Sequence, residues 1–486
     1  MRNSLLVALI FQGVFFFGAC TQERSGQPPN IIVILCDDLG YGDLACYGHP
    51  HIQTPNIDGL AAGGIRLTSC YSAAPVCSPS RVGLLTGRSP LRAGVYDWIP
   101  EARDESEDGR DLVHMRASET TIPELLKTAG YQTCLVGKWH CNAKFNSPEQ
   151  AQPSDFGFDW WFSTQNNALP NHKNPINFVR NGEAVGPMQG FSCQLVVQEA
   201  IDWLNRADME KPFYLQVCFH EPHENVASPM DLVDQYEAVS KNHDEAQYFA
   251  NVANVDSAVG ILMDRIVSLG EEGTTLVIFT SDNGPETLNR YSEAYRSYGS
   301  PGELKGMKLW THEAGFRVPG IIYWPGRMDG GVVLDTPVSS LDFLPTFCSL
   351  SRVDVANQDL DGRDISAFFG GGEVNRSKPL LWCHYNALND HYVAMRDGDW
   401  KIMAKLNVEG NILPSLHNVH DGNEKLVKSA VLEDHMLYQL SEDPSELKEV
   451  SADHPDVFNR MKELLQNQYA ELLDDSHIWR RTATEQ

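Results

Sequence analysis

The sequence has 486 residues, 42% of them hydrophobic, and a formal net charge of -27. This length is sufficient for one large domain with a substantial core and a smaller second domain. The negative charge excludes a nucleic-acid-binding protein, because contacts with phosphates require a basic surface. It does not exclude an anionic small molecule, since charges are screened beyond about 8 Å at physiological salt and a local basic pocket still attracts an anion.

Residues 1–20 are predicted to be an export signal. Arg2 precedes a short apolar run that ends in Gly18-Ala19-Cys20, a pattern typical of a signal peptide rather than a membrane span. Phe17-Gly18-Ala19-Cys20 is similar to a bacterial lipobox, which predicts a lipid on Cys20 and a membrane tether. Cleavage to a soluble periplasmic protein is the alternative. Either way, we expect an exported protein, periplasmic or at the cell surface.

Four unbroken apolar runs predict strands that are buried on both faces of a parallel sheet. They span residues 31–36, 131–136, 213–219 and 275–280. Segments with helical signals lie between them, at residues 121–130, 195–207 and 249–269. This alternation predicts an α/β fold with a large, mostly parallel sheet flanked by helices. Polar residues follow each run, so we expect them to share one crevice at the carboxyl edge of the sheet.

Carboxylates and an amide follow the first and the last of these strands. Asp37 and Asp38 come directly after residues 31–36, and Asp282 and Asn283 follow residues 275–280. Each pair alone could be a solvated turn. Together, at matching strand ends, they predict a four-oxygen site suited to a hard cation such as Ca²⁺.

Basic side chains are expected beside this cation. Lys138 and His140 lie two residues apart and would point to one side if the strand continued through them. Arg81, His223 and Lys308 would join them at the same crevice. Buried positive charge of this amount requires a partner, which predicts a bound anion.

The segment 74–88 carries signals for a short helix that begins directly after Cys77. Ser78 is a good N-cap, Pro79 suits the first turn and Gly87 suits the C-terminal stop. Cys77 would then lie at a helix N-terminus, where free backbone N–H groups favour an anion. The alternative is that Cys77 is a small buried hydrophobic residue.

Nine further cysteines are predicted to be mostly buried thiols. Their number is odd and the sequence contains no Cys-x-x-Cys pair, which argues against a disulfide framework and against a zinc site.

Two long stretches, residues 97–119 and 160–190, show no regular pattern and are predicted to be binding loops, with solvated surface loops as the alternative. Beyond Gly370-Gly371-Gly372, short strands at 380–382, 392–395 and 400–403 precede a helix at 455–473. We therefore expect a catalytic domain over residues 28–370. Residues 378–486 would form a smaller C-terminal subdomain, an antiparallel sheet with one helix.

Cys77-Ser78-Pro79-Ser80-Arg81 resembles the activation motif of the type I sulfatases, in which the cysteine is oxidised to Cα-formylglycine. Motifs of the same family, in the same order, are similar to segments along nearly the whole chain after residue 28. These segments are residues 37–43, 54–58, 85–88, 137–140, 220–223, 281–284, 304–308 and 312–319. The resemblance implies the alkaline-phosphatase-like fold, sulfate-ester hydrolysis, and a maturation enzyme that makes the formylglycine.

The resemblance also implies roles for individual residues. Asp37, Asp38, Asp282 and Asn283 would hold Ca²⁺ together with formylglycine 77, and Asp282 would accept the proton of the nucleophile. Arg81 and Lys138 would hold the formylglycine hydrate, and His140 would take the proton that triggers sulfate release. His223 and Lys308 would bind sulfate and help protonate the leaving alcohol. His220 and Lys305 are weaker candidates.

The expected substrate is a sulfated carbohydrate. The polar loop from Asn167 to Arg180 is similar to a loop of bacterial glycan-degrading sulfatases, which places Asn167, His172 and Arg180 near the sugar, with His220 as a further candidate. The acidic segment 101–111 would reject long polyanions, which favours exo action on short oligosaccharides. Two alternatives remain: a phosphodiesterase or phosphonate monoester hydrolase of the same superfamily, and an inactive glycan-binding surface lipoprotein.

Overall fold

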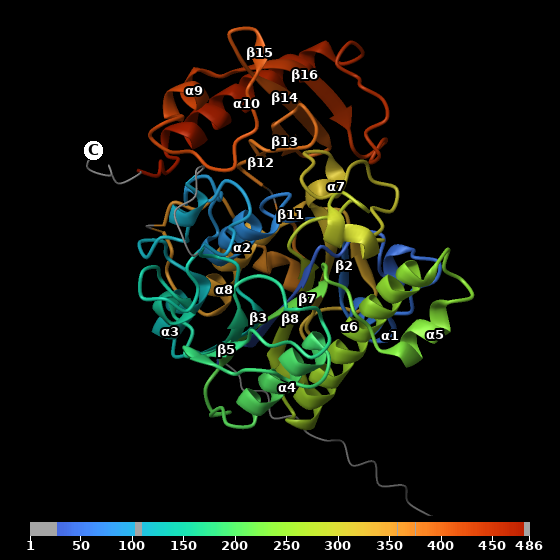
Figure 1. Ribbon diagram of the computed structural model, residues 1–486. Coiled ribbons are helices and arrows are strands. Elements are labelled where there is room, and N and C mark those ends of the chain that lie inside the picture. The colour runs from blue at the N-terminus through green and yellow to red at the C-terminus, as the bar shows by residue number, and fades with distance from the viewer. Residues whose placement is uncertain (1–26, 103–108, 357, 375, 481–486) are drawn as a thin grey trace, which may run out of the picture.

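The computed structural model describes residues 27–102, 109–356, 358–374 and 376–480, which form two β-sheets and their flanking helices (Figure 1). The larger sheet has eleven strands in the order β10-β2-β9-β8-β1-β7-β3-β4-β5-β6, with β11 paired to β2. Its strands are β1 (Asn30–Asp37), β2 (Ile65–Tyr71), β3 (Gln132–Lys138), β4 (Trp160–Thr164), β5 (Val179–Arg180), β6 (Glu183–Ala184), β7 (Phe213–Pro222), β8 (Thr275–Ser281), β9 (Arg317–Tyr323), β10 (Val332–Leu334) and β11 (Val338–Ser339).

The centre of this sheet is parallel, as the apolar runs predict. β1 pairs in parallel with β7 and β8, and β3 pairs in parallel with β7 and β4. β9 runs antiparallel between β2 and β8, and the short β5 and β6 are also antiparallel. The predicted large, mostly parallel sheet is confirmed.

Successive residues of β1 point to opposite faces of the sheet, which explains its unbroken apolar sequence. Ile31, Val33 and Leu35 belong to one hydrophobic cluster, and Ile32 and Ile34 belong to the other. The first cluster is covered by α2, α3 and α8, and the second by α1, α4 and α6. These helices are α1 (Pro55–Gly63), α2 (Cys77–Thr86), α3 (Ile122–Thr128), α4 (Ser192–Leu204), α6 (His243–Ser268) and α8 (Phe343–Leu350).

A second, antiparallel sheet follows in the C-terminal part of the chain and lies at one end of the molecule (Figure 1). Its order is β12-β13-β14-β15, with β16 on the other side of β14. Met461, Leu465 and Tyr469 of α10 are buried in the cluster that also holds Ile402 of β14. The bounds are β12 (Leu380–Cys383), β13 (Val393–Asp397), β14 (Trp400–Val408), β15 (Asn411–Ile412), β16 (Val431–Gln439) and α10 (Pro455–Asp474).

The remaining α-helices are short: α5 (Met230–Tyr236), α7 (Glu313–Phe316) and α9 (Glu424–Ser429). No helix within the described ranges has the length and apolar character needed to cross a membrane. The predicted export signal and Cys20 lie outside the described residues. The ten cysteines that are described are free thiols, nine of them buried, as expected.

Two local predictions differ from the structure. Helix α2 begins at Cys77 itself with Val76 as its N-cap, because the Ser78 hydroxyl accepts a hydrogen bond from Ile99 N instead of capping the helix. The predicted stop is correct, since Gly87 has a left-handed φ of 65° and its N–H bonds to Gly83 O. The stretch 160–190 is also more regular than expected, because residues 160–164 form strand β4 beside β3.

Candidate active site

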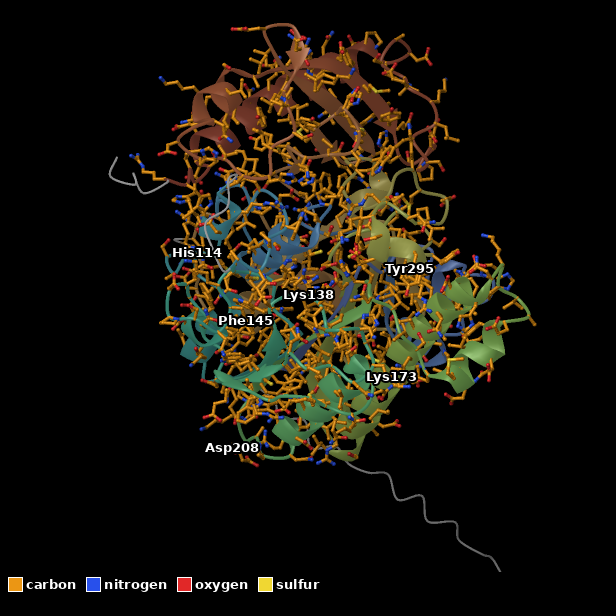
Figure 2. The ribbon with its side chains drawn as sticks, in the orientation of Figure 1. His114, Lys138, Phe145, Lys173, Asp208 and Tyr295 are labelled. Carbon is orange, nitrogen blue, oxygen red and sulfur yellow. The ribbon has the colours of Figure 1, made fainter. Side chains whose placement is uncertain are left out.

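The polar residues that follow the parallel strands meet at one edge of the large sheet. Asp37 ends β1, Lys138 ends β3, and Ser281 ends β8 directly before Asp282. The register pairs Asp37 with Pro222, so the segment after β7 reaches the same edge. Lys138 lies among closely packed side chains in the middle of the molecule (Figure 2). The shared crevice that the sequence predicts is therefore present.

A cavity of about 520 Å³ opens above this edge, and Cys77 lies in its wall. His140, His223 and Lys308 line the same cavity. Cys77 is only 2% exposed, and burial raises the pKa of its thiol, although Lys138 and Lys308 act in the opposite direction. The sulfur is thus held as a neutral thiol, which is a poor nucleophile.

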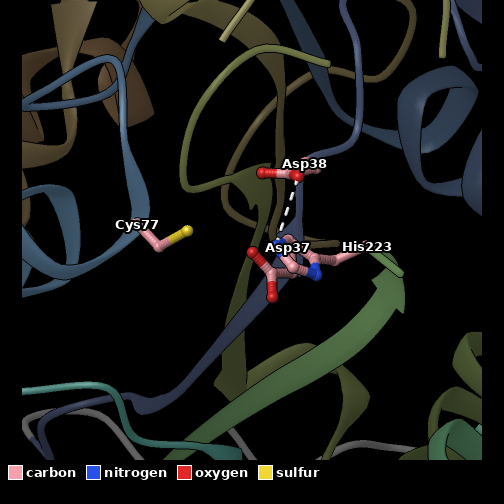
Figure 3. A group of neighbouring side chains, drawn as sticks. All are labelled: Asp37, Asp38, Cys77 and His223. Atoms are coloured by element: carbon pink, nitrogen blue, oxygen red, sulfur yellow. Dashed lines mark ion pairs between the residues drawn. The ribbon is translucent and has the colours of Figure 1, made fainter. Parts of the chain in front are cut away.

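Four side chains in the cavity floor are close enough to share one cation. Ligand atoms of Asp37, Asp38, Cys77 and His223 all lie within 4.8 Å of one another (Figure 3). His223 was predicted as a sulfate-binding residue, and its Nε2 lies 3.6 Å from Asp38 Oδ2. The other two predicted metal ligands are adjacent: Asp38 N donates to Asp282 Oδ1, and the Asn283 amide donates to Asp38 Oδ1 at 2.6 Å.

Unpaired oxygens show that these residues fit a metal ion. Asp37 Oδ1 and Asn283 Oδ1 are buried and receive no hydrogen bond from any described residue. A buried oxygen without a donor costs free energy, which a hard cation would recover. The residues therefore suit an oxygen-coordinated divalent cation.

Three carboxylates and three cations form what we call the floor cluster: Asp37, Asp38, Asp282, Arg81, Lys138 and Lys308. Lys138 Nζ lies 2.6 Å from Asp37 Oδ2, and Lys308 Nζ lies 2.8 Å from Asp38 Oδ2. Arg81 holds Asp282 Oδ2 through Nε at 2.9 Å and Nη2 at 2.6 Å. All six side chains are buried.

The carboxylates of the floor cluster differ in how well they are neutralised. At Asp37, burial raises the pKa, but Lys138, His223 and Arg81 outweigh it and hold the pKa well below its usual value. At Asp38 and Asp282 burial prevails, and their pKa values rise to about 6 and about 7. The cluster lacks positive charge at these two residues, which a divalent cation would supply.

His140 is held as a neutral imidazole with one free nitrogen. Its Nε2 lies 2.8 Å from Ile99 O, and because a carbonyl only accepts hydrogen bonds, Nε2 must carry the hydrogen. Burial, together with Lys138 and Arg81, lowers the pKa of the ring well below its usual value. Nδ1 is buried and has no partner among the described residues, so it is a free proton acceptor.

The strand geometry does not continue from Lys138 to His140, contrary to expectation. β3 ends at Lys138, and His140 has a φ of 55°. Lys138 consequently reaches Asp37, whereas His140 turns to Ile99 and lines the cavity. A left-handed histidine has no signature in the sequence.

The four predicted substrate residues are not all at the cavity. Asn167 lines it. Arg180 lies on β5, where Glu199 accepts its Nε hydrogen bond at 2.9 Å, so the structure does not bring it to the cavity wall. His172 contacts Asn251, and His220 contacts Thr164; both histidines are buried, and neither lines the cavity.

Six residues of the cavity form what we call its outer wall: Trp98, Glu224, Asn225, Arg290, Tyr291 and Glu293. Most of them were not predicted from the sequence. Trp98 falls within the loop predicted at 97–119, but nothing marked it as a wall residue. Glu224 directly follows the segment 220–223, and this adjacency could have indicated it. Three other members come from irregular segments without a pattern: Asn225, Arg290 and Tyr291. Glu293 lies in a short 3-10 helix, Ser292–Arg296.

Comparison with known proteins gives consistent results. A family model described as Sulfatase matches residues 29–353. Human arylsulfatase A is 32% identical, over 90% of this chain and 87% of that protein. Rat N-acetylgalactosamine-6-sulfatase is 31% identical, over 92% of this chain and 86% of that protein. The solved structure of Ps i-CgsB in complex with k-i-k-neocarrahexaose is 26% identical, with a TM-score of 0.75, and covers 94% of this chain and 96% of that chain.

Proposed function

Because the chain belongs to the sulfatase family and is a sulfuric ester hydrolase, we propose that it releases inorganic sulfate from a sulfated carbohydrate, using residue 77 as formylglycine. The observation that carries the proposal is the cavity in which Cys77 adjoins the carboxylates of the floor cluster. The similarity to N-acetylgalactosamine-6-sulfatase and to a structure in complex with k-i-k-neocarrahexaose supports a carbohydrate substrate.

The geometry around residue 77 favours a modified side chain. A neutral buried thiol is a poor nucleophile, and a sulfated serine or cysteine would need a second attack to be released. A formylglycine hydrate supplies one hydroxyl that attacks the sulfur atom and a second hydroxyl whose collapse to an aldehyde expels sulfate. The free Nδ1 of His140 is suited to take the proton of this second hydroxyl.

The floor cluster would perform the remaining tasks. Asp37, Asp38, Asp282 and Asn283 would hold Ca²⁺, which when bound polarises the sulfate ester. Arg81 and Lys138 are fixed beside residue 77 by Asp282 and Asp37. Lys308 and His223 line the cavity, where they would stabilise charge on the bridging oxygen as the alcohol leaves. Asp282 keeps lone pairs with which it would accept the proton of the attacking hydroxyl.

The first test is chemical. The protein should be produced in a host that contains a maturation enzyme, and the peptide that includes residue 77 should be analysed by mass spectrometry for formylglycine. The modified protein should then release sulfate from an aryl sulfate and from members of a panel of sulfated mono- and oligosaccharides. Unmodified cysteine in an active enzyme would contradict the formylglycine mechanism. An aryl phosphodiester hydrolysed with a higher kcat/KM than the aryl sulfate would favour the phosphodiesterase alternative.

The metal can be tested independently of activity. Chelation should lower the melting temperature, and added Ca²⁺ should restore it, since a ligand at 100-fold over its Kd stabilises a fold by about 2.7 kcal/mol. Asp37→Asn should lose this response to Ca²⁺. A melting temperature that is unchanged by chelation and by Ca²⁺ would contradict the metal site. Glycan affinity that survives chelation, with no turnover of any sulfate ester, would favour the glycan-binding alternative.

Export and lipid attachment are proposed from the sequence alone, because residues 1–26 lie outside the described ranges. Labelling of the expressed protein with a radioactive fatty acid should occur in the wild type and disappear in Cys20→Ala. A wild-type protein that is exported without label would be the soluble periplasmic form.

A further inference from the structure

The cavity that contains Cys77 has an outer wall that differs in character from its floor. Its members include two rings, Trp98 and Tyr291, and two acidic residues, Glu224 and Glu293. Trp98 is 36% exposed, and the guanidinium of Arg110 lies over its ring, 4.8 Å from the centroid. Flat aromatic faces suit the C–H face of a sugar ring. This wall is the part of the cavity that a sugar would contact once its sulfate lies at the floor.

Glu224 is one of the cavity residues with an unused acceptor oxygen, and Asn166 Oδ1 and Asn167 Oδ1 are others. It is 4% exposed, and its Oε2 is buried without a hydrogen bond from any described residue. His223 Nδ1 lies 3.4 Å from this oxygen but makes its hydrogen bond, at 2.8 Å, to Glu224 O. An acceptor that is buried in a cavity wall and has no donor is unfavourable unless a ligand supplies one.

The cations near this wall are already paired. Arg290 donates to both oxygens of Glu286 at 2.7 Å. Lys308 contacts Asp38 at 2.8 Å and Glu286 at 3.7 Å. Among the described residues that line the cavity, no arginine or lysine forms an ion pair with Glu224 or Glu293, although Lys308 and Arg290 are close enough to attract the Glu224 carboxylate. The two carboxylates accept hydrogen-bond donors and disfavour an anion that lies directly against them.

We propose that Glu224 is a specificity-determining residue that accepts a hydrogen bond from a hydroxyl or amide N–H next to the sulfated carbon and, with Glu293, disfavours a second anionic group. The preferred substrate is then an otherwise neutral sugar, a hexose or N-acetylhexosamine, that carries a single sulfate. A second sulfate or a carboxylate on the same ring would lie against the Glu224 carboxylate. This inference rests on the proposed sulfatase function and adds the class of sugar to it.

The test compares singly and doubly sulfated forms of the same sugar. Substrates are the 4-sulfates, 6-sulfates and 4,6-disulfates of galactose and N-acetylgalactosamine, with 4-nitrophenyl sulfate as a generic substrate. Wild-type enzyme that carries formylglycine should have a kcat/KM at least about tenfold higher for the preferred monosulfate than for the matching disulfate. In Glu224→Gln, which keeps the size of the side chain but removes its charge, this ratio should fall at least about fivefold. The matched control Glu442→Gln, an exposed residue of the C-terminal part, should keep the wild-type ratio.

The possible results separate this inference from the function on which it rests. If 4-nitrophenyl sulfate is not hydrolysed by formylglycine-bearing enzyme, the sulfatase function itself is contradicted. If 4-nitrophenyl sulfate is hydrolysed but no sugar sulfate is, the carbohydrate substrate and the role of Glu224 are both wrong. If the disulfates react as well as the monosulfates, or if Glu224→Gln leaves the ratio unchanged, only the role of Glu224 is overturned. The wild-type comparison stands even if Glu224→Gln does not fold.

Discussion

Two buried charge clusters among the described residues resemble each other in composition but not in surroundings. One is the floor cluster. The other, which we call the interface cluster, consists of Lys401, Glu313, Glu446 and Arg317. Lys401 Nζ lies 2.9 Å from oxygens of both Glu313 and Glu446, and Arg317 lies 3.3 Å from Glu313. It joins β14 of the C-terminal sheet to α7, which directly precedes β9 of the large sheet.

The difference between the clusters lies in their access to the cavity. Lys308 of the floor cluster lines the cavity together with Cys77, whereas no member of the interface cluster lines it. Glu313 is further held by the Tyr71 hydroxyl at 2.6 Å. Burial and shifted pKa values occur at both sites, so neither feature alone identifies an active site. Access from the cavity distinguishes the two.

Cys77→Ala should produce the largest effect and should be confined to activity. Removal of the proposed nucleophile should lower kcat at least about 10⁴-fold, as for other residues that act covalently. The melting temperature should change little, because the substitution removes one sulfur from a helix start. Measurable turnover above that limit would show that residue 77 is not the nucleophile.

Lys401→Met should have the opposite effect to Cys77→Ala, lowering the stability of the fold while leaving activity nearly unchanged. Loss of one partner from a buried ion pair leaves uncompensated carboxylates and should cost about 3 kcal/mol of unfolding free energy. The kcat of the folded fraction should stay within about twofold of wild type, because no member of the interface cluster reaches the cavity. Urea unfolding and aryl sulfate turnover measure the two quantities.

Lys405→Met is the matched control for this change. Lys405 lies on the same strand, β14, but is 22% exposed and pairs with the exposed Asp390 and Asp434 at 3.6 and 3.4 Å. Its loss should cost less than about 1 kcal/mol. Equal destabilisation by Lys401→Met and Lys405→Met would mean that the interface cluster does not stabilise the fold.

Lys308→Ala should lower kcat by about 10², since Lys308 would stabilise charge as it develops in the cavity. Lys305, three residues earlier, instead contacts Glu446 O at 3.2 Å, so Lys305→Ala should keep kcat within about twofold. Near wild-type kcat in Lys308→Ala would remove this residue from the mechanism. A similar loss in both variants would indicate a structural effect of the whole segment.

The smallest expected effect concerns pH and the interface cluster. Burial and the neighbouring Glu313 raise the pKa of Glu446 to about 7, although Lys401 acts in the opposite direction. Lys401 and Arg317 outweigh burial at Glu313 and lower its pKa to about 2. Glu446 therefore binds a proton more tightly in the folded state, and its contribution to stability is lost as the pH rises from 4.5 through 7.

Glu446→Gln should flatten this decline. The variant cannot ionise at this position, so its urea unfolding midpoint should fall less between pH 5 and pH 7 than that of the wild type, with Ca²⁺ held at saturation. The contribution of Glu313 has the opposite sign, because it is present above pH 4.5 and disappears only as the pH falls towards 2. Parallel pH profiles for the two proteins would show that Glu446 titrates normally.

The central strands and the floor cluster could be predicted from the sequence for one physical reason. A parallel strand buried on both faces is apolar without interruption, and the polar residue that ends it is then conspicuous, as at Asp37 and Asp282. The antiparallel position of β9 in the sheet was not predicted, because a sequence does not show the direction in which a strand pairs. β2, with Arg66 and Thr68 only partly buried, has no such continuous run.

The outer wall could not be predicted because its residues come from loops whose conformation depends on distant contacts. Arg180 appeared available for a sugar, but Glu199, nineteen residues later, binds its guanidinium. Arg290 and Tyr291 reach the cavity from an irregular segment after β8. The position of His140 depends on the positive φ of its backbone, which the identity of the residue does not predict.

The burial of Cys77 also bears on the order in which the chain folds and residue 77 is converted to formylglycine. Every residue of α2 is buried, including the whole segment from Cys77 to Arg81. An enzyme that oxidises the Cys77 thiol would need more access to this segment than the folded protein offers. Conversion would therefore have to precede folding. A molecule that folds before conversion would keep Cys77 unmodified. Whether a molecule becomes an active enzyme would then be decided before its large sheet forms.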